Sequence, residues 1–412
     1  MSMLQFATSV VQRLVDAGFI AYFAGGWVRD FLMQRPSDDI DIATSATVDQ
    51  VQALFPKTVP VGVAFGIILV VEGGHPFEVA TFRKDRGYTD GRRPIGIDPA
   101  GPEEDAKRRD FTINGMFYDP LKKQLFDYVN GQQDIKNKLI RAIGNPHDRF
   151  LEDRLRMMRA VRYATRFDFP IEPSTVQAIL DHASTLLPSV AMERVWQEFK
   201  KMTQFAHFNR GLVMLQELRL LPTIFPELKD VTPEEIQKRT NAIPHFPKNT
   251  PAIAELLELF TDTSLQELLD LCEKLKLSRG EQDFVRFYHH AKELLKMPPD
   301  WQKGLELIEW AQFYANPSAT ICIEIFAAHY PKEKKEHFLQ EHRERQILLK
   351  KAIERLATNQ PVVRAEHLIQ AGIAPGKKMG TLLKEAERIA VNDSLDDPHL
   401  VVAKLKASPL WG

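Results

Sequence analysis

The stretch Gly25-Gly26-Trp27-Val28-Arg29-Asp30 is followed closely by Asp39-Ile40-Asp41-Ile42-Ala43. Side chains on a β-strand alternate between its two faces, so Asp39 and Asp41 are predicted to point the same way. Two adjacent carboxylates repel each other unless a cation lies between them. Oxygen ligands of this kind suit Mg²⁺, which usually keeps waters and also binds substrate phosphates. The stretch therefore predicts a magnesium site held by two aspartates.

Glu78, within Phe77-Glu78-Val79-Ala80-Thr81-Phe82, is the candidate for a third carboxylate. It lies in a predicted strand that we expect to pair beside the two aspartates. A site of three carboxylates is predicted to hold two ions about 4 Å apart, one activating an attacking hydroxyl and one the leaving group. The alternative for a lone Asp-x-Asp pattern is a solvated strand end, which such patterns often form.

The glycine pair favours the first interpretation. Gly25 and Gly26 allow backbone N–H groups to approach a phosphate, at a turn into a predicted helix whose N-terminus favours anions. Arg29, one turn into that helix, adds a charged fork of donors. A glycine turn, an arginine and two aspartates so close together indicate a nucleotide phosphate site more strongly than any of them alone.

A second group of charged residues begins at Glu152. The pattern predicts a single amphipathic helix over residues 150–166. Glu152, Asp153, Arg156 and Arg159 share its polar face, which is about 120° wide at about 100° per residue. Leu151, Leu155, Met158 and Val161 form the apolar face, and Arg162 lies between the two faces.

The polar face offers a way to choose between bases. Asp153 can accept a hydrogen bond from an exocyclic amine, and Arg156 can donate one to the neighbouring ring nitrogen. Cytosine and adenine satisfy both groups, whereas uracil and guanine leave them unpaired, at a cost of about 1–3 kcal/mol each. The helix could therefore select C and A without a template. The alternative, favoured when the helix is considered alone, is ion pairing on a solvated face.

A third group is Arg108-Arg109-Asp110-Phe111-Thr112-Ile113-Asn114. Arg109 is a candidate to bind a triphosphate, and Asp110 to accept a hydrogen bond from a ribose hydroxyl. Asn114 is predicted to belong to the same nucleotide site. Capping of a helix end and local ion pairing explain these residues equally well on chemistry alone.

The chain changes character near residue 140, which predicts an α+β protein. Short β-rich runs precede this point and helical periodicity follows it. Strands are expected at 20–26, 39–44, 66–73, 77–82 and 124–129, and head helices at 4–17, 26–34, 47–54 and 103–117. Residues 84–102 are expected to form a long mobile loop. Two more helices are predicted within 173–205, separated near Pro188. We predict a catalytic head at 1–140, a helical neck at 141–205, a helical body at 206–355 and a helical tail at 356–412.

Composition excludes several classes of protein. The chain has 412 residues, a net charge of −1 and two cysteines. The absence of a cysteine framework predicts a reducing compartment, and with no membrane-spanning run we expect the cytoplasm. The first residues are predicted to form a helix rather than a signal peptide. His147-Asp148 lacks the further ligands of a metal phosphohydrolase.

Together these residues resemble the class II tRNA nucleotidyltransferases, the CCA-adding enzymes and their bacterial poly(A) polymerase relatives. The matching stretches occur in the family's order and cover residues 20–202. They are GGWVRD (25–30), DDIDIAT (38–44), FEVATFR (77–83), RRDFTING (108–115), EDRLRMMRAVRYATRF (152–167) and MERVWQEFKK (192–201).

The resemblance implies that Asp39 and Asp41 bind Mg²⁺ and that Gly26, Arg29 and Arg109 contact the incoming CTP or ATP. It implies further that Asp153 and Arg156 select the base, with Arg159 and Arg162 supporting the same pocket. Residues 84–102 resemble the loop linked to switching from C to A addition, and residues 367–387 resemble the tail segment that grips the tRNA elbow.

The sequence favours a CCA-adding enzyme acting on the tRNA 3′ end over two alternatives. The first is an A-adding enzyme or poly(A) polymerase of the same family. The second, of another class, is a non-catalytic RNA-binding protein, which is disfavoured because the carboxylates and arginines of the motifs are all present. The oligomeric state is not predicted.

Overall fold

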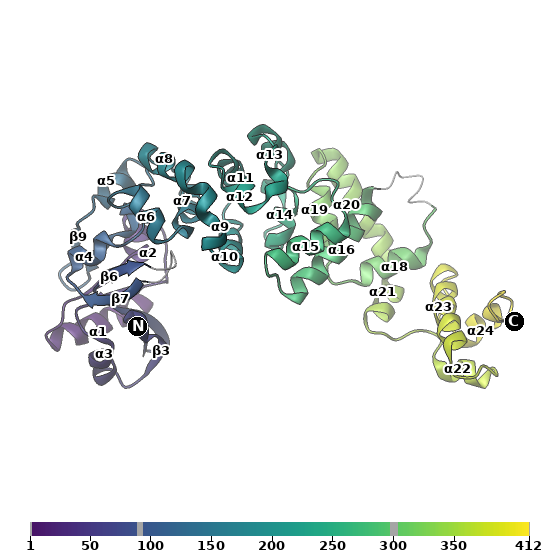
Figure 1. The fold of residues 1–412 in the computed structure, drawn as a ribbon. Helices are drawn as coiled ribbons and strands as arrows, with labels where there is room; N and C mark the ends of the chain where they lie inside the picture. The colour runs from purple at the N-terminus through teal and green to yellow at the C-terminus, as the bar shows by residue number, and fades with distance from the viewer. Residues whose placement is uncertain (1, 89–93, 297–303, 412) are drawn as a thin grey trace. The chain divides into compact units, whose positions relative to one another are not determined.

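A computed structural model describes residues 2–88, 94–296 and 304–411 of the chain. The chain divides into two compact units, Met1–Lys238 and Arg239–Gly412. The first unit contains all of the predicted site residues (Figure 1). Within the described residues no helix is long and apolar enough to cross a membrane.

A mixed seven-stranded sheet forms the centre of the first unit, in the order β3-β4-β5-β2-β1-β8-β9. Its strands are β1 (Ala21–Ala24), β2 (Asp41–Thr44), β3 (Thr58–Gly62), β4 (Ile67–Glu72), β5 (His75–Thr81), β8 (Met116–Asp119) and β9 (Gln124–Asp127). Helices α1 (Met3–Asp16), α2 (Gly26–Leu32) and α3 (Val48–Leu54) accompany it. The predicted small mixed sheet is confirmed.

The core of the head lies between this sheet and the helices. The apolar positions of α1 recur at helical spacing, so Ala7, Val10, Val11 and Leu14 are all fully buried. They pack with buried residues of β1, β2, β4 and β5. This core fixes the strands on which the predicted carboxylates lie.

Strand pairing brings the predicted carboxylates near one another. β2 pairs with β5 in parallel, with Ile42 opposite Val79 and Ala43 opposite Ala80. Asp41 and Glu78 are the residues directly before Ile42 and Val79, so the same register places them beside each other. The predicted pairing of these two strands is confirmed.

Some expected elements of the head are wrong. The helix expected over 103–117 is the short α4 (Pro102–Lys107), followed by a 3₁₀ turn at Thr112–Asn114 and by β8. The loop expected over 84–102 contains β6 (Arg83–Tyr88) and β7 (Pro94–Pro99), which pair antiparallel. Residues 89–93 of that loop lie outside the described residues. Glycine and proline composition concealed this ribbon, because strand pairing does not depend on local preference alone.

The single helix predicted over 150–166 is also wrong. The structure has α6 (Pro146–Glu152) and α7 (Leu155–Phe167), which are separated at Asp153. Asp153 is extended (φ −147°, ψ 104°), and its Oδ1 accepts a hydrogen bond from the Leu155 backbone N–H at 3.1 Å. Aspartate is a favoured residue at a helix start for this reason. The predicted shared polar face is therefore divided between two helices.

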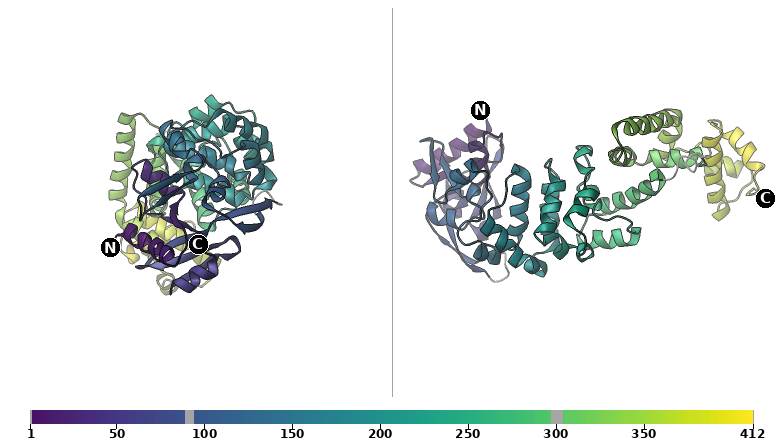
Figure 2. Two further views of the ribbon diagram at one scale, coloured as in Figure 1. Left: turned by 90° about the vertical axis from the view of Figure 1, so that its left-hand side faces the viewer. Right: turned by 90° about the horizontal axis from the view of Figure 1, so that it is seen from above.

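From α6 onwards the described chain is built of helices and their connections, with no strand among the described residues (Figures 1 and 2), so the predicted all-α neck, body and tail are confirmed as a class. The remaining helices of the first unit are α5 (Gly131–Lys136), α8 (Pro173–His182), α9 (Leu186–Ser189), α10 (Met192–Met202), α11 (Phe208–Glu217), α12 (Leu220–Ile224) and α13 (Pro233–Arg239). The four domain boundaries stay predictions.

The second unit has its own buried groups. Its helices are α14 (Ala252–Leu257), α15 (Leu265–Lys274), α16 (Arg279–Lys296), α18 (Leu307–Ala315), α19 (Ala319–Ala327), α20 (Lys332–Leu348), α21 (Lys350–Ala357), α22 (Ala365–Gln370), α23 (Lys377–Asn392) and α24 (Pro398–Lys406). The buried Glu258 carboxylate accepts hydrogen bonds from Tyr288 and His329, at 3.2 and 2.7 Å. These bonds tie the end of α14 to α16 and to the turn that follows α19.

Glu255 on α14 carries a buried carboxyl with no hydrogen-bond or ion-pair partner among the described residues. Its side chain is 8% exposed, and burial raises its pKa from 4.5 to about 8. Because the folded-state pKa is the higher one, stability should fall as pH rises from 4.5 towards 8. We expect Glu255→Gln to stabilise the protein by about 1–3 kcal/mol at pH 8 and little at pH 4.5.

Urea unfolding at several pH values measures this difference. Glu336→Gln, which removes an exposed carboxylate, should show no comparable pH-dependent gain. An equal effect of the two substitutions would contradict the account of Glu255.

Candidate active site

The site begins at the turn between β1 and α2. Gly25 has φ +63°, a conformation that glycine adopts without strain. A Cβ atom at this position would lie 3.0 Å from Arg109 Nη1 and 3.9 Å from Asp41 Oδ2. The glycine is therefore required both by its backbone angle and by the close approach of a cation and a carboxylate.

Three carboxylates share the neighbouring region of the sheet. Asp39 is exposed just before β2, Asp41 is the half-buried first residue of β2, and Glu78 is exposed on β5. Burial, together with the charges of Glu78 and Asp39, raises the pKa of Asp41 to about 7, although Arg109 opposes the rise. Partial burial and Asp39 also raise the pKa of Glu78, against the effect of Arg83. The predicted catalytic carboxylates are thus close enough to repel one another.

This donor set fits a hard divalent cation. All three groups supply oxygen ligands, and their mutual repulsion would be relieved by positive charge. Within the described residues, no group of three or more acidic, histidine or cysteine side chains is gathered closely enough to enclose an ion by itself. Carboxylate oxygens are the kind of ligand that Mg²⁺ accepts, beside waters and substrate phosphates.

Arg109 lies beside the carboxylates and is held from behind. Its Nε and Nη2 donate to Asp105 Oδ2 at 3.2 and 3.0 Å, and its guanidinium lies 4.9 Å from the centre of the Phe117 ring. Burial opposes ionisation of Asp105, but Arg109 and Arg108 hold its pKa below the usual value. The ionised Asp105 orients Arg109 towards Gly25, where a phosphate could be bound.

Arg29 is in a different situation from Arg109. Its side chain is buried, and its Nε and Nη2 donate to the two Asp30 oxygens at 2.9 Å each. Its Nη1 donates to Asn114 Oδ1 at 2.6 Å, and its guanidinium lies 4.8 Å from the Phe167 ring. Arg29 therefore links the head to α7, and its contact with a nucleotide stays a prediction.

Asn114 continues this network to Asp110 and Arg159. Its Nδ2 donates to Asp110 Oδ1 at 3.2 Å, and Arg159 Nε donates to Asp110 Oδ2 at 2.7 Å. Although burial opposes ionisation, the Arg159 guanidinium holds the pKa of Asp110 well below its usual range. Asp110 is therefore a permanent anion that binds the head to α7.

The two residues predicted to select the base each have a protein partner. Asp153 Oδ2 accepts from Arg194 Nη2 on α10 at 2.9 Å. Arg156 Nη1 donates to Glu152 Oε2 at 2.5 Å, and its Nη2 donates to the Arg108 carbonyl at 3.1 Å. Both groups are thus positioned by protein contacts, and the Arg108 contact attaches them to the head.

Arg162, predicted to support the same pocket, is buried and donates from Nε to Glu198 Oε2 on α10 at 2.5 Å. It also lies 4.3 Å from the centre of the Tyr163 ring. The structure therefore places Arg162 at the contact between α7 and α10.

Sequence reasoning missed the acidic and basic groups that hold these residues. Asp30, Asp105, Arg194 and Glu198 each bind a predicted site residue. Three of them, Asp30, Arg194 and Glu198, stand inside motifs that the resemblance rests on, GGWVRD and MERVWQEFKK. For Arg194 and Glu198 that position was the available signal, since their partners lie 41 and 36 residues away in the sequence, whereas Asp30 directly follows its partner Arg29.

Carboxylates on adjacent strands, beside a glycine turn and an arginine, define a nucleotidyltransferase site. Residues 21–141 match the model described as "Poly A polymerase head domain". Residues 168–232 match the model described as "Probable RNA and SrmB- binding site of polymerase A".

Individual proteins agree with this class. A CCA-adding enzyme of Pediococcus pentosaceus is 33% identical over 400 residues, 96% of each chain. The Bacillus stearothermophilus CCA-adding enzyme, solved in complex with CTP, has a TM-score of 0.81 and 28% identity over 99% of this chain and 98% of its own. A Thermotoga maritima CCA-adding enzyme complexed with tRNA supports the fold, with a TM-score of 0.65 and 21% identity over 98% and 95%. The chain belongs to the CCA-adding enzyme family.

Gly25→Ala, compared with a control glycine, should distinguish the effect of backbone strain from the effect of displacing Arg109. We expect it to reduce nucleotide transfer by about 10–100-fold, because the new methyl group displaces Arg109. Gly144→Ala is the matched control, since Gly144 also has a positive φ (+69°) but open space around its Cβ position.

Both substitutions should cost about 1–3 kcal/mol of stability in urea unfolding. Only Gly25→Ala should impair transfer in a primer-extension assay. Equal activity of the two variants would contradict the role given to Gly25.

Proposed function

We propose that the chain adds cytidine and adenosine from CTP and ATP to the 3′ end of tRNA, in the cytoplasm and with Mg²⁺. The observation that carries this proposal is the coupled set Asp39, Asp41 and Glu78 beside Gly25 and Arg109. Its family membership, and the CTP described with the Bacillus stearothermophilus relative, support the choice of substrates.

Each part of the site has a task in this reaction. Asp39 and Asp41 hold the cations, and Glu78 is proposed to complete that set. Divalent cations there supply activation of the primer hydroxyl and stabilisation of the leaving pyrophosphate. Arg109, fixed by Asp105, offers its charge to the triphosphate, and the backbone at Gly25 and Gly26 approaches the phosphates.

Base choice is assigned to Asp153 and Arg156. Arg194 and the Leu155 backbone N–H hold the Asp153 carboxylate in place. A carboxylate has about four lone-pair sites, so these two contacts leave room for an exocyclic amine to donate to Asp153. Arg156 is presented by Glu152 and offers donors to a ring nitrogen. A base with a carbonyl facing Asp153 would leave both groups unsatisfied.

The helical part is proposed to hold the rest of the RNA. In this proposal the neck carries the selector, and the tail segment at 367–387, which includes the end of α22 and most of α23, contacts the tRNA elbow. The division into head, neck, body and tail at residues 140, 205 and 355 belongs to the same proposal.

Incubation with defined primers tests the function. Purified protein, Mg²⁺ and tRNA transcripts ending before CCA, after C and after CC are combined with CTP, ATP or both. We expect all three transcripts to be completed to CCA and then left unextended. Extension of the CC-ended transcript alone would identify an A-adding enzyme, open-ended A tails a poly(A) polymerase, and RNA binding without extension a non-catalytic protein.

Loss of a cation ligand should separate chemistry from RNA binding. Asp41→Asn is expected to abolish transfer, because it removes a charge from the site, while the affinity for tRNA stays unchanged. Asp49→Asn, at an exposed position in the first turn of α3, should retain activity in the same extension and filter-binding assays. Transfer by Asp41→Asn at the parental rate would refute the assignment.

Loss of the selector carboxylate should relax base choice more than it slows transfer. For Asp153→Ala we expect discrimination of CTP against UTP to fall by roughly 5- to 150-fold, which corresponds to about 1–3 kcal/mol. Single-nucleotide incorporation with each NTP, as kcat/KM, measures the ratio. An unchanged ratio would exclude Asp153 as the selector.

A further inference from the structure

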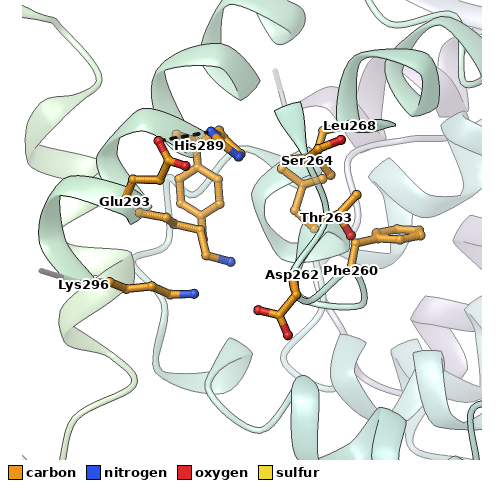
Figure 3. Close-up of a pocket in the computed structure, with 11 residues that line it drawn as sticks. Phe260, Asp262, Thr263, Ser264, Leu268, His289, Glu293 and Lys296 are labelled. Atoms are coloured by element: carbon orange, nitrogen blue, oxygen red, sulfur yellow. Dashed lines mark ion pairs between the residues drawn. The ribbon is translucent and has the colours of Figure 1, made fainter. Parts of the chain in front are cut away.

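A cavity of about 350 Å³ opens in the second unit, and none of the residues assigned to the nucleotidyltransferase site lines it. One wall is α16, which presents His289, Lys292 and Lys296, and the facing wall is the segment from Phe260 to Ser264 that leads into α15. Figure 3 shows Lys296 and Asp262 extending into the space from opposite walls. Neither the matched family models nor the proposed reaction gives this cavity a role.

Lys292 is the distinctive group in the cavity. Its ammonium lies 5.5 Å from the centre of the Tyr288 ring, and the side chain is partly buried. Among the described residues, no carboxylate oxygen comes within 4.0 Å of it. Burial and the charge of Lys296 lower its pKa, although Glu258 and Asp262 act in the other direction. Lysines that lose much of their contact with solvent are usually paired with an anion, and among the described residues Lys292 has only the longer-range charges of Glu258 and Asp262.

The carboxylates near Lys292 either have other partners or lie farther from it. Glu258 is bound by Tyr288 and His329, and Glu293 lies 3.8 Å from His289. Asp262 is exposed on the facing wall and influences Lys292 only at longer range. Lys296, one turn from Lys292, adds a second positive charge to the same wall.

We propose that this cavity binds a phosphate group through Lys292 and Lys296. An oxyanion between the two ammonium groups would relieve their repulsion and give Lys292 its missing partner. The phosphate comes either from the backbone of a bound RNA or from a free phosphate compound. This site goes beyond the proposed reaction, because it lies in the body and needs no transfer chemistry.

Two binding measurements on the full chain test the proposal. The first is the salt dependence of binding to a tRNA transcript lacking CCA, for the parent and for Lys292→Gln. The second is the thermal unfolding midpoint with inorganic phosphate or AMP, each matched with chloride at equal ionic strength. Lys334→Gln on α20, an exposed lysine, is the control, and Lys292→Arg retains the charge.

If RNA supplies the phosphate, Lys292→Gln should reduce the slope of log K against log salt by about one. If a free compound supplies it, the slope should stay unchanged while the phosphate-dependent rise of the midpoint shrinks. Lys334→Gln and Lys292→Arg should behave as the parent does in both assays. Lys292→Gln behaving like Lys334→Gln in both would overturn the proposal.

Asp262→Asn gives an independent test should Lys292→Gln fail to fold. Removal of the opposing carboxylate is expected to strengthen binding of the phosphate, whether the RNA backbone or a free compound supplies it. Unchanged affinity for tRNA and for phosphate in that variant would also overturn the proposal. Both readouts are binding measurements, so they remain informative even if the chain fails to add CCA.

Discussion

Like charge concentrated at one place is the constraint on which the rest of the structure depends. Asp41 and Glu78 lie on strands paired in parallel, with Asp39 just outside, and burial together with the neighbouring negative charges raises the pKa of both Asp41 and Glu78. A cation between the carboxylates would relieve this repulsion, which is the role proposed for the divalent cations of nucleotidyl transfer. The buried core between α1 and the sheet keeps the strands in register, and Gly25 lets Arg109 approach without a steric clash.

A second set of charges joins this head to the helices that follow. The path from Arg29 through Asn114 and Asp110 to Arg159 is largely buried and is closed by short hydrogen bonds. Burial makes each charge expensive alone, so removal of any one would leave its partner uncompensated. The same network gives the predicted selector helix α7 a fixed place beside the nucleotide site. The residues proposed for catalysis and those proposed for base choice lie in separate motifs of the sequence, and this network joins the elements that carry them.

The sequence predicted most of the catalytic head, because alternation on a strand is a local property. Asp41 and Glu78 could be assigned to neighbouring strands from the sequence, whereas Asp39, expected in the same strand as Asp41, lies just before β2. The break at Asp153 was missed, since helical periodicity runs through it and only its capping bond to Leu155 reveals the end of α6. The partners Arg194 and Glu198 were also missed, because nothing local links them to Asp153 and Arg162. The β6–β7 ribbon was hidden by a composition typical of loops.

The most direct test counts the cations that these carboxylates hold. Mn²⁺ replaces Mg²⁺ at oxygen sites and can be counted by electron paramagnetic resonance in the presence of a non-hydrolysable CTP analogue. The account predicts about two bound Mn²⁺ per chain and a clear loss of binding in Asp41→Asn and Glu78→Gln, but not in Asp49→Asn. Equal Mn²⁺ binding by all four proteins would contradict it.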